Sequence, residues 1–120
     1  TMLTGVKFLN LERNSIGDAG VTSIAMSPVF SRLTLLNLWK NEIGPEGAQA
    51  IANSLVLGNL QNLDLAHNKI GDIGGKALAE SQTLTSLEYV DLFGNGIGEE
   101  TQLLIKESLN FKNLKHLVLE

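Results

Sequence analysis

Two aspartates and a histidine are the residues of this sequence best suited to chemistry. Asp64 and Asp91 occupy matching places in two similar stretches, and His67 follows the first of them closely. If these stretches form neighbouring β-strands, the two carboxylates lie about 4.8 Å apart, with the imidazole one pleat away. Such a set could bind a metal ion or share a proton in acid/base catalysis.

A simpler interpretation competes with this one. Two further stretches hold Asn10 and Asn37 at the same place, so a polar row facing water also accounts for the aspartates. The sequence contains no Ser-His-Asp set, phosphate-binding loop or Cys/His ligand spacing. We therefore predict that the protein is not an enzyme and has no metal, catalytic or cofactor site; a metal-dependent enzyme using Asp64 and Asp91 is the least favoured alternative.

Aromatic side chains point to binding instead. Four of the six aromatic residues fall between or just after the apolar positions of the strand-like stretches, which places them on an exposed strand face. Contiguous exposed apolar surface usually marks a contact, although aromatic residues also simply suit strand surfaces. The predicted partner-binding residues are Phe8, Glu12, Arg13, Leu35, Asn37, Trp39, Lys40, Asp64, His67, Tyr89, Asp91 and Phe93.

Trp39 is the predicted main contact of this surface. Its ring is expected to lie over the small Ala66 and to approach Phe93 beyond it. A rigid indole brings a large apolar area to an interface and loses little rotamer entropy there. In the alternative interpretation, Trp39 only shields the sheet.

A repeated unit must position these residues. Asparagines recur every 27 residues, at Asn14, Asn41, Asn68 and Asn95, and a fifth copy begins near Leu114. Apolar residues stand five and three places before each asparagine, and this alternation predicts a short strand with one buried face. Because each strand recurs only after a long crossover, the strands are expected to be parallel. The asparagines should then form an inward-facing row whose amides bond the turns of adjacent units.

Helices are predicted after the asparagines. Glycines 17, 44, 71 and 98 should enter them through a conformation that a β-carbon would strain, followed by acidic residues favoured at a helix N-terminus. Pro28 should end the first helix early. Phe30 and Phe111 are assigned to the core and His116 to the surface.

Composition narrows the class of protein further. Hydrophobic residues make up 43% and charged residues 18% of 120 residues, which excludes a disordered chain. The net charge of −4 and the scattered basic residues argue against nucleic acid, and no apolar run is long enough for a membrane span. The absence of cysteine favours a cytoplasmic protein, with secretion as an effector left as an alternative.

The pattern Leu-x-x-Leu-x-Leu-x-x-Asn-x-Ile-Gly-Asp-x-Gly resembles the leucine-rich repeats of the ribonuclease-inhibitor type over about residues 3 to 119. This resemblance implies an α/β fold, a right-handed solenoid with a parallel concave sheet and convex helices. It also implies a module that binds a protein partner on its concave sheet, with a regulatory or scaffolding segment of a larger immune-sensor-like or bacterial-effector-like protein as the alternative. Thr101 departs from the pattern by replacing a helix glycine, so the fourth helix should pack differently.

One domain, residues 1–120, should contain about four and a half 27-residue repeats. Leu3 already matches Phe30 in the repeat although no helix precedes it, and Leu119 is followed by none. We therefore expect a piece of a longer solenoid, or self-association through uncapped ends.

Overall fold

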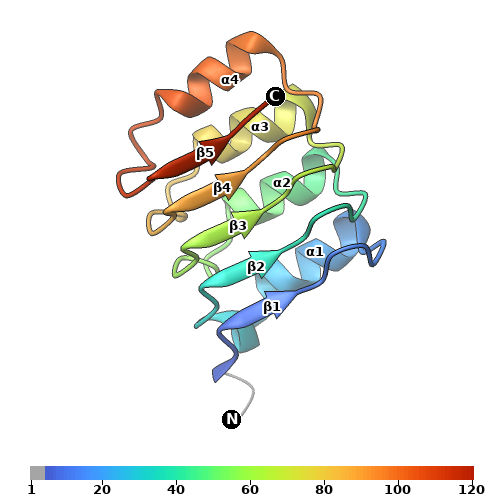
Figure 1. The fold of residues 1–120 in the computed structure, drawn as a ribbon. Helices are drawn as coiled ribbons and strands as arrows, with labels where there is room; N and C mark the ends of the chain where they lie inside the picture. Colours follow the sequence, from blue (N-terminus) through green and yellow to red (C-terminus); the bar gives the residue numbers. More distant parts are fainter. Residues whose placement is uncertain (1–4) are drawn as a thin grey trace.

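The computed structural model describes residues 5–120, so the position of Leu3 lies outside the described part. Five short parallel strands form one sheet in the order β1-β2-β3-β4-β5, and four helices cover one of its faces (Figure 1). The strands are β1 (Phe8–Asn10), β2 (Leu35–Asn37), β3 (Asn62–Asp64), β4 (Tyr89–Asp91) and β5 (His116–Val118). The helices are α1 (Gly17–Met26), α2 (Pro45–Ala52), α3 (Gly71–Ala79) and α4 (Glu99–Lys106). The predicted α/β solenoid is confirmed.

The core lies between the sheet and the helices. The alternating apolar residues of the inner units face it, and Leu36, Leu38, Leu63 and Leu65 are fully buried. Their counterparts in the first and last units are only partly buried, because each has a neighbouring unit on one side alone: Leu9, Leu11, Leu117 and Leu119. Each inner unit therefore depends on both neighbours for its burial.

The repeated asparagines form the predicted ladder, with one correction at its first member. Asn41, Asn68 and Asn95 are buried, and the Oδ1 of Asn68 accepts the backbone amides of Asn41 and Ile43 from the preceding unit. Asn14 is exposed rather than buried, although its side-chain amide donates to the carbonyls of Leu11 and Glu12 in its own turn, as that of Asn68 does to Leu65 and Ala66. The backbone amide of Asn14 donates to Asn41 Oδ1 at 2.9 Å. The side chain of Asn14 remains exposed because no described unit precedes it.

A second ladder runs along the carboxyl ends of the helices. The Ser54 hydroxyl donates to the carbonyl of Ala25 at 2.5 Å, and Ser81 donates in the same way to Ala52 at 2.6 Å. Ser81 is 1% exposed, and its oxygen also accepts the amide of Leu84. Each hydroxyl thus satisfies a helix carbonyl that has no partner within its own helix.

The helices begin in two ways rather than the one predicted. Gly17 and Gly71 have φ values of +68° and +64°, where a side chain would be strained, whereas Gly44 and Gly98 are extended. At Gly44 the reason for glycine is space, because an added β-carbon would lie 3.1 Å from the Asp18 carboxylate. That carboxylate accepts the amide of Gly44 at 2.7 Å, so it caps α2 as well as lying in the first turn of α1.

Pro28 does not shorten the first helix, and this prediction was wrong. Helix α1 has ten residues and is the longest of the four. The restriction that proline imposes falls on Ser27, which is extended, so the helix can continue to Met26. Pro28 then opens a short 3-10 turn, Pro28–Phe30.

The fourth helix accommodates Thr101 through a glycine in its neighbour. Thr101 is 8% exposed, and its Cγ2 lies 2.9 Å from the position that a β-carbon on Gly75 would occupy. The glycine of helix α3 therefore leaves room for the threonine side chain of α4.

Candidate functional site

The sheet face turned away from the helices, the concave face, carries the predicted partner-binding residues in straight rows. The strand register pairs Phe8 with Leu35, Leu35 with Asn62, Asn62 with Tyr89, and Tyr89 with His116. A second row pairs Asn10, Asn37, Asp64, Asp91 and Val118 in the same order. Backbone bonds continue this register past the strands, for example from the Lys40 amide to the Ala66 carbonyl. Because alternate residues of a strand share a face, the register places six of the predicted residues on one side of the sheet: Phe8, Leu35, Asn37, Asp64, Tyr89 and Asp91.

The second row also shapes the backbone. Asn37 Oδ1 accepts the amide of Trp39 at 3.0 Å, and Asp64 Oδ1 accepts the amide of Ala66 at 2.9 Å. Asn10 and Asp91 make the same bond two residues ahead, so each of the first four units turns sharply after its strand. The role of this row in the turns was not predicted from the sequence.

Aromatic rings and a guanidinium form a continuous array across four units. The Arg13 guanidinium lies 5.0 Å from the Trp39 ring centroid, a cation–π distance. The Trp39 and His67 centroids are 5.5 Å apart, and those of His67 and Phe93 are 5.6 Å apart, both edge-to-face. The ring next to both Trp39 and Phe93 is thus that of His67, a contact that was not predicted from the sequence.

The accessible parts of this array differ from one ring to the next. Phe8 is 69% exposed and Phe93 is 46% exposed, whereas Trp39 and Tyr89 are half-buried. Ala66 is buried, because larger side chains cover this small residue. Trp39 therefore presents part of its ring to solvent and packs the rest on its neighbours.

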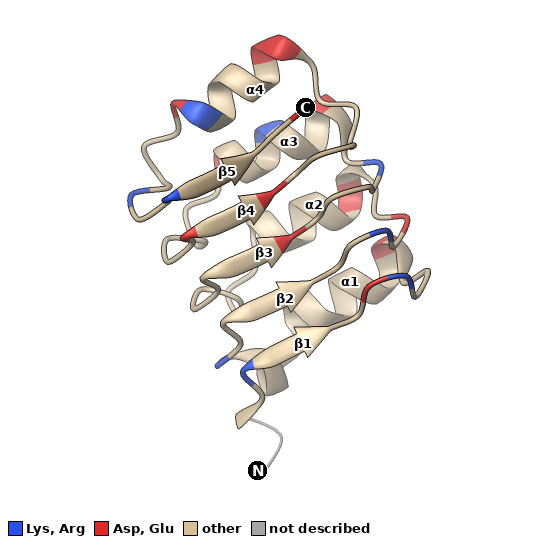
Figure 2. Ribbon diagram, viewed as in Figure 1, with Lys and Arg blue, Asp and Glu red and all other residues tan. Residues whose placement is uncertain are grey.

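Asp64 and Asp91 lie side by side where β3 and β4 end, and Figure 2 shows acidic residues at these strand ends. Burial raises the pKa of Asp64 above its ordinary value, and the carboxylates of Asp91 and Glu12 raise it further; the Ala66 amide and His67 act in the opposite direction. Burial and the same two aspartates also raise the pKa of Tyr89, whose hydroxyl lies 3.5 Å from Asp91 Oδ2. Within residues 5–120, no three His, Cys, Asp or Glu side chains gather closely enough to hold a metal ion.

Basic residues line the margin of the concave face. Arg13, Ser15, Lys40 and Glu42 surround an open hollow of about 400 Å³ in the loops after β1 and β2. All four have positive φ values between 50° and 62°, a backbone conformation that is uncommon for residues other than glycine. The sequence identified Arg13 and Lys40 from their row but gave no signal for Ser15 and Glu42, because neither belongs to a strand row.

The carboxyl ends of α1 and α2 bound a second hollow, which the sequence analysis did not identify. It is mostly apolar and about 400 Å³ in volume. Met26 and Leu55 at this hollow are 72% and 91% exposed. The repeat gave no signal for this hollow, because leucine stands at both 55 and the equivalent position 109.

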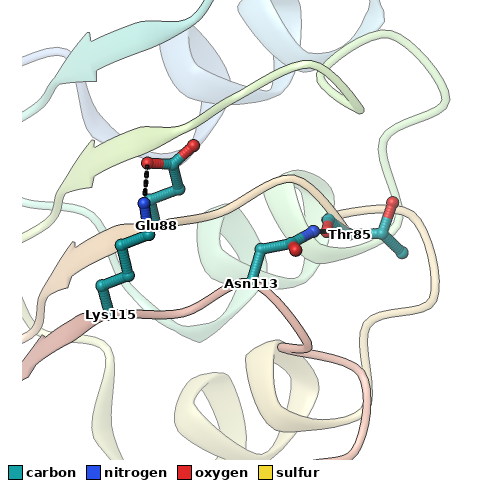
Figure 3. A network of polar contacts seen from close by, with 4 residues as sticks. All are labelled: Thr85, Glu88, Asn113 and Lys115. Carbon is teal, nitrogen blue, oxygen red and sulfur yellow. Dashed lines mark hydrogen bonds and ion pairs between the residues drawn. The ribbon is translucent and has the colours of Figure 1, made fainter.

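One ion pair joins side chains in the described part of the chain, and it lies away from the aspartates. Lys115 Nζ is 3.4 Å from Glu88 Oε1, just before β5 and β4 begin. Figure 3 shows this pair beside Asn113, whose amide donates to the Thr85 carbonyl at 3.0 Å. The contacts join the last two units at the amino ends of their strands.

Parallel strands, convex helices and buried asparagine and serine ladders, repeated at a fixed period, define a β/α solenoid. A family model for a leucine-rich repeat matches residues 6–25 and 32–52, and a model for two copies of leucine-rich repeats matches residues 58–105. The chain belongs to the leucine-rich repeat proteins, whose repeats are generally protein–protein interaction modules. A search of curated proteins returned no match. None of the helices within residues 5–120 is both long and apolar enough to cross a membrane.

Proposed function

We propose that the protein binds a protein partner across its concave face. The observation that carries this proposal is the array of Arg13, Trp39, His67 and Phe93, partly open to solvent on a sheet face that no other described element covers. Solenoids of this kind use extended concave surfaces for binding. A regulatory or scaffolding role in a larger protein, a cytoplasmic location and the ribonuclease-inhibitor subtype belong to the same proposal.

Trp39 is the proposed central contact. Its ring is held from both sides, by the Arg13 guanidinium and by the His67 imidazole, so little conformational entropy remains to be lost on binding. Trp and Arg are also enriched where truncation weakens an interface most. Arg13 and Lys40 on the margin would steer the encounter and orient the partner.

A comparison of two variants tests the proposal. Wild-type protein, Trp39→Ala and Gln49→Ala are immobilised, and proteins captured from a lysate are identified; Gln49 is exposed on α2, on the opposite side of the molecule. The purified partner is then titrated against each variant, and melting temperatures are measured in parallel. We expect Trp39→Ala to weaken binding at least about tenfold and Gln49→Ala to leave it unchanged. Equal affinities of the two variants would move the candidate surface to the helices.

Self-association is a second candidate, favoured by a specific observation. Leu9 and Leu117 remain partly exposed in the outer units, whereas the equivalent Leu36 and Leu63 are fully buried. Within residues 5–120, the outer strands β1 and β5 each pair with one strand only. Light scattering over a range of concentrations tests this candidate, and a monomer at every concentration would rule it out for this chain.

A further inference from the structure

The negative charges of Asp64 and Asp91 are not needed for the turns that these residues form. In the first two units, Asn10 and Asn37 make the same Oδ1 bond to the amide two residues ahead, at 3.2 and 3.0 Å. The aspartates make it at 2.9 and 3.0 Å. An uncharged amide therefore serves this backbone position equally well, and the charges need another explanation.

These charges act against the stability of the sheet. Asp64 and Asp91 are direct partners in the register of β3 and β4, and like charges opposite each other on neighbouring strands are destabilising. No basic side chain within residues 5–120 forms an ion pair with either carboxylate. Glu12 adds a third negative charge whose field reaches Asp64.

The remaining groups around the aspartates suit a cation. Tyr89 lies beside Asp91 on β4, and its hydroxyl is 3.5 Å from that carboxylate. Phe93, two residues beyond Asp91, is 46% exposed, and the face of such a ring attracts a guanidinium or ammonium group. The basic Arg13 and Lys40 lie in the loops after β1 and β2, where Glu12 and Glu42 also lie, and neither forms an ion pair with Asp64 or Asp91. Figure 2 shows acidic residues at the ends of β3 and β4.

We propose that the concave face over β3 and β4 receives an arginine or lysine side chain of the protein partner, which sits against Asp64 and Asp91 with Tyr89 and Phe93 beside it. This inference rests on the proposed concave binding function and names the chemistry of the partner: a basic segment, oriented so that its cation meets the third and fourth units. The partner's cation supplies the missing counter-charge, so binding relieves the repulsion between the two carboxylates.

Nuclear magnetic resonance titrations with a defined probe test the inference. The probe is a blocked Gly-Arg-Gly peptide, and its control carries citrulline, an uncharged isostere, in place of arginine. The amides of Ala66 and Phe93 donate to the two aspartates, so their signals should shift on titration with the arginine peptide. Those of Glu12 and Trp39, which donate to Asn10 and Asn37, are internal controls in the same spectrum. Equal shifts with both peptides, or shifts centred on Glu99 and Glu100 of α4, would overturn the inference.

The double variant Asp64→Asn/Asp91→Asn provides the matched control. It should fold, because asparagine already occupies the same position in the first two units. We expect it to bind the arginine peptide about fivefold more weakly or worse, and the difference should shrink as salt is raised. Unchanged affinity would overturn the basic-partner inference. The wider proposal is tested separately: if Trp39→Ala weakens partner binding while the double variant does not, the concave face binds a partner of another charge.

Discussion

The backbone amide of Asn41 donates a 2.8 Å hydrogen bond to the side-chain oxygen of Asn68, one unit further along the chain. The same oxygen accepts the amide of Ile43, and the Asn68 amide group donates to the carbonyls of Leu38 and Leu65. Both partners of the first bond are buried, so neither unit can satisfy its turn with water. One side chain thus joins two units by bonds that an apolar residue cannot make.

Replacing Asn68 by leucine should therefore destabilise the protein more than the same replacement at Asn62. Asn68→Leu leaves buried amides and carbonyls without partners, and each unsatisfied group costs about 1–3 kcal/mol. Asn62 is half-exposed in a strand row of the concave face and has no such task. Urea denaturation of both variants measures the difference. Equal changes in the free energy of unfolding would contradict the assignment of Asn68 to the buried ladder.

The sequence predicted the ladder well because its period is visible in residue types alone. Strand register, helix placement and the buried row all follow from one 27-residue spacing. The exposure of Asn14 and the contacts of Trp39 were not predictable in this way, since they depend on which side chains lie beside a residue in the neighbouring unit. The ring between Trp39 and Phe93 comes from His67, which belongs to a different row.

Gly75 and Thr101 form a compensating pair, so their substitutions should not be additive. An alanine at 75 would place its β-carbon 2.9 Å from Thr101 Cγ2, and the stiff threonine cannot turn away freely. Gly75→Ala alone should therefore destabilise the protein by about 1 kcal/mol or more. Serine at position 101 lacks the threonine methyl group. In the Thr101→Ser background, Gly75→Ala should therefore stabilise α3 by about 0.5–1 kcal/mol.

A double-mutant cycle measures this coupling from the two single variants and the double variant. Gly5→Ala is a suitable control for a glycine-to-alanine change without a steric clash, because a β-carbon at position 5 meets no atom within 4 Å. If Gly75→Ala changes stability by the same amount with threonine or serine at 101, the two residues do not compensate each other.

Glu120 extends the asparagine ladder with a carboxylate. Its Oε1 accepts the amides of Asn95 at 2.8 Å and Ile97 at 3.3 Å. These positions are equivalent to Asn41 and Ile43, whose amides Asn68 accepts two units earlier. Burial alone would raise the pKa of Glu120, but these backbone bonds and those from the nearby glycines outweigh it and hold the pKa below 4.5.

A carboxyl group whose pKa is lower in the folded state than in the unfolded chain stabilises the fold when it is ionised. The contribution of Glu120 should be complete above pH 4.5 and should be lost as the pH falls through its folded value. We expect wild-type protein to be more stable than Glu120→Gln at pH 7 and this advantage to vanish on acidification. Thermal denaturation of both proteins from pH 7 to pH 3 measures it. A stability difference that does not vary with pH would show that the charge is not used.

The pKa shift of Asp64 has the opposite direction, so its charge should destabilise the fold. Burial, followed by the neighbouring Asp91 and Glu12, raises its pKa above 3.8, so the folded state holds the proton more tightly than the unfolded chain. Stability should then fall as the pH rises from 3.8 through the folded value, and Asp64→Asn should gain over the wild type in that window. Paired denaturation curves for the two proteins at pH 3 and pH 7 check the trend. If the variant gains nothing at pH 7, the carboxylate is not destabilising, and the charge need not be explained by a partner. If Asp64→Asn instead gains stability and loses affinity for the arginine peptide, the carboxylate destabilises the fold but contributes to binding the basic ligand.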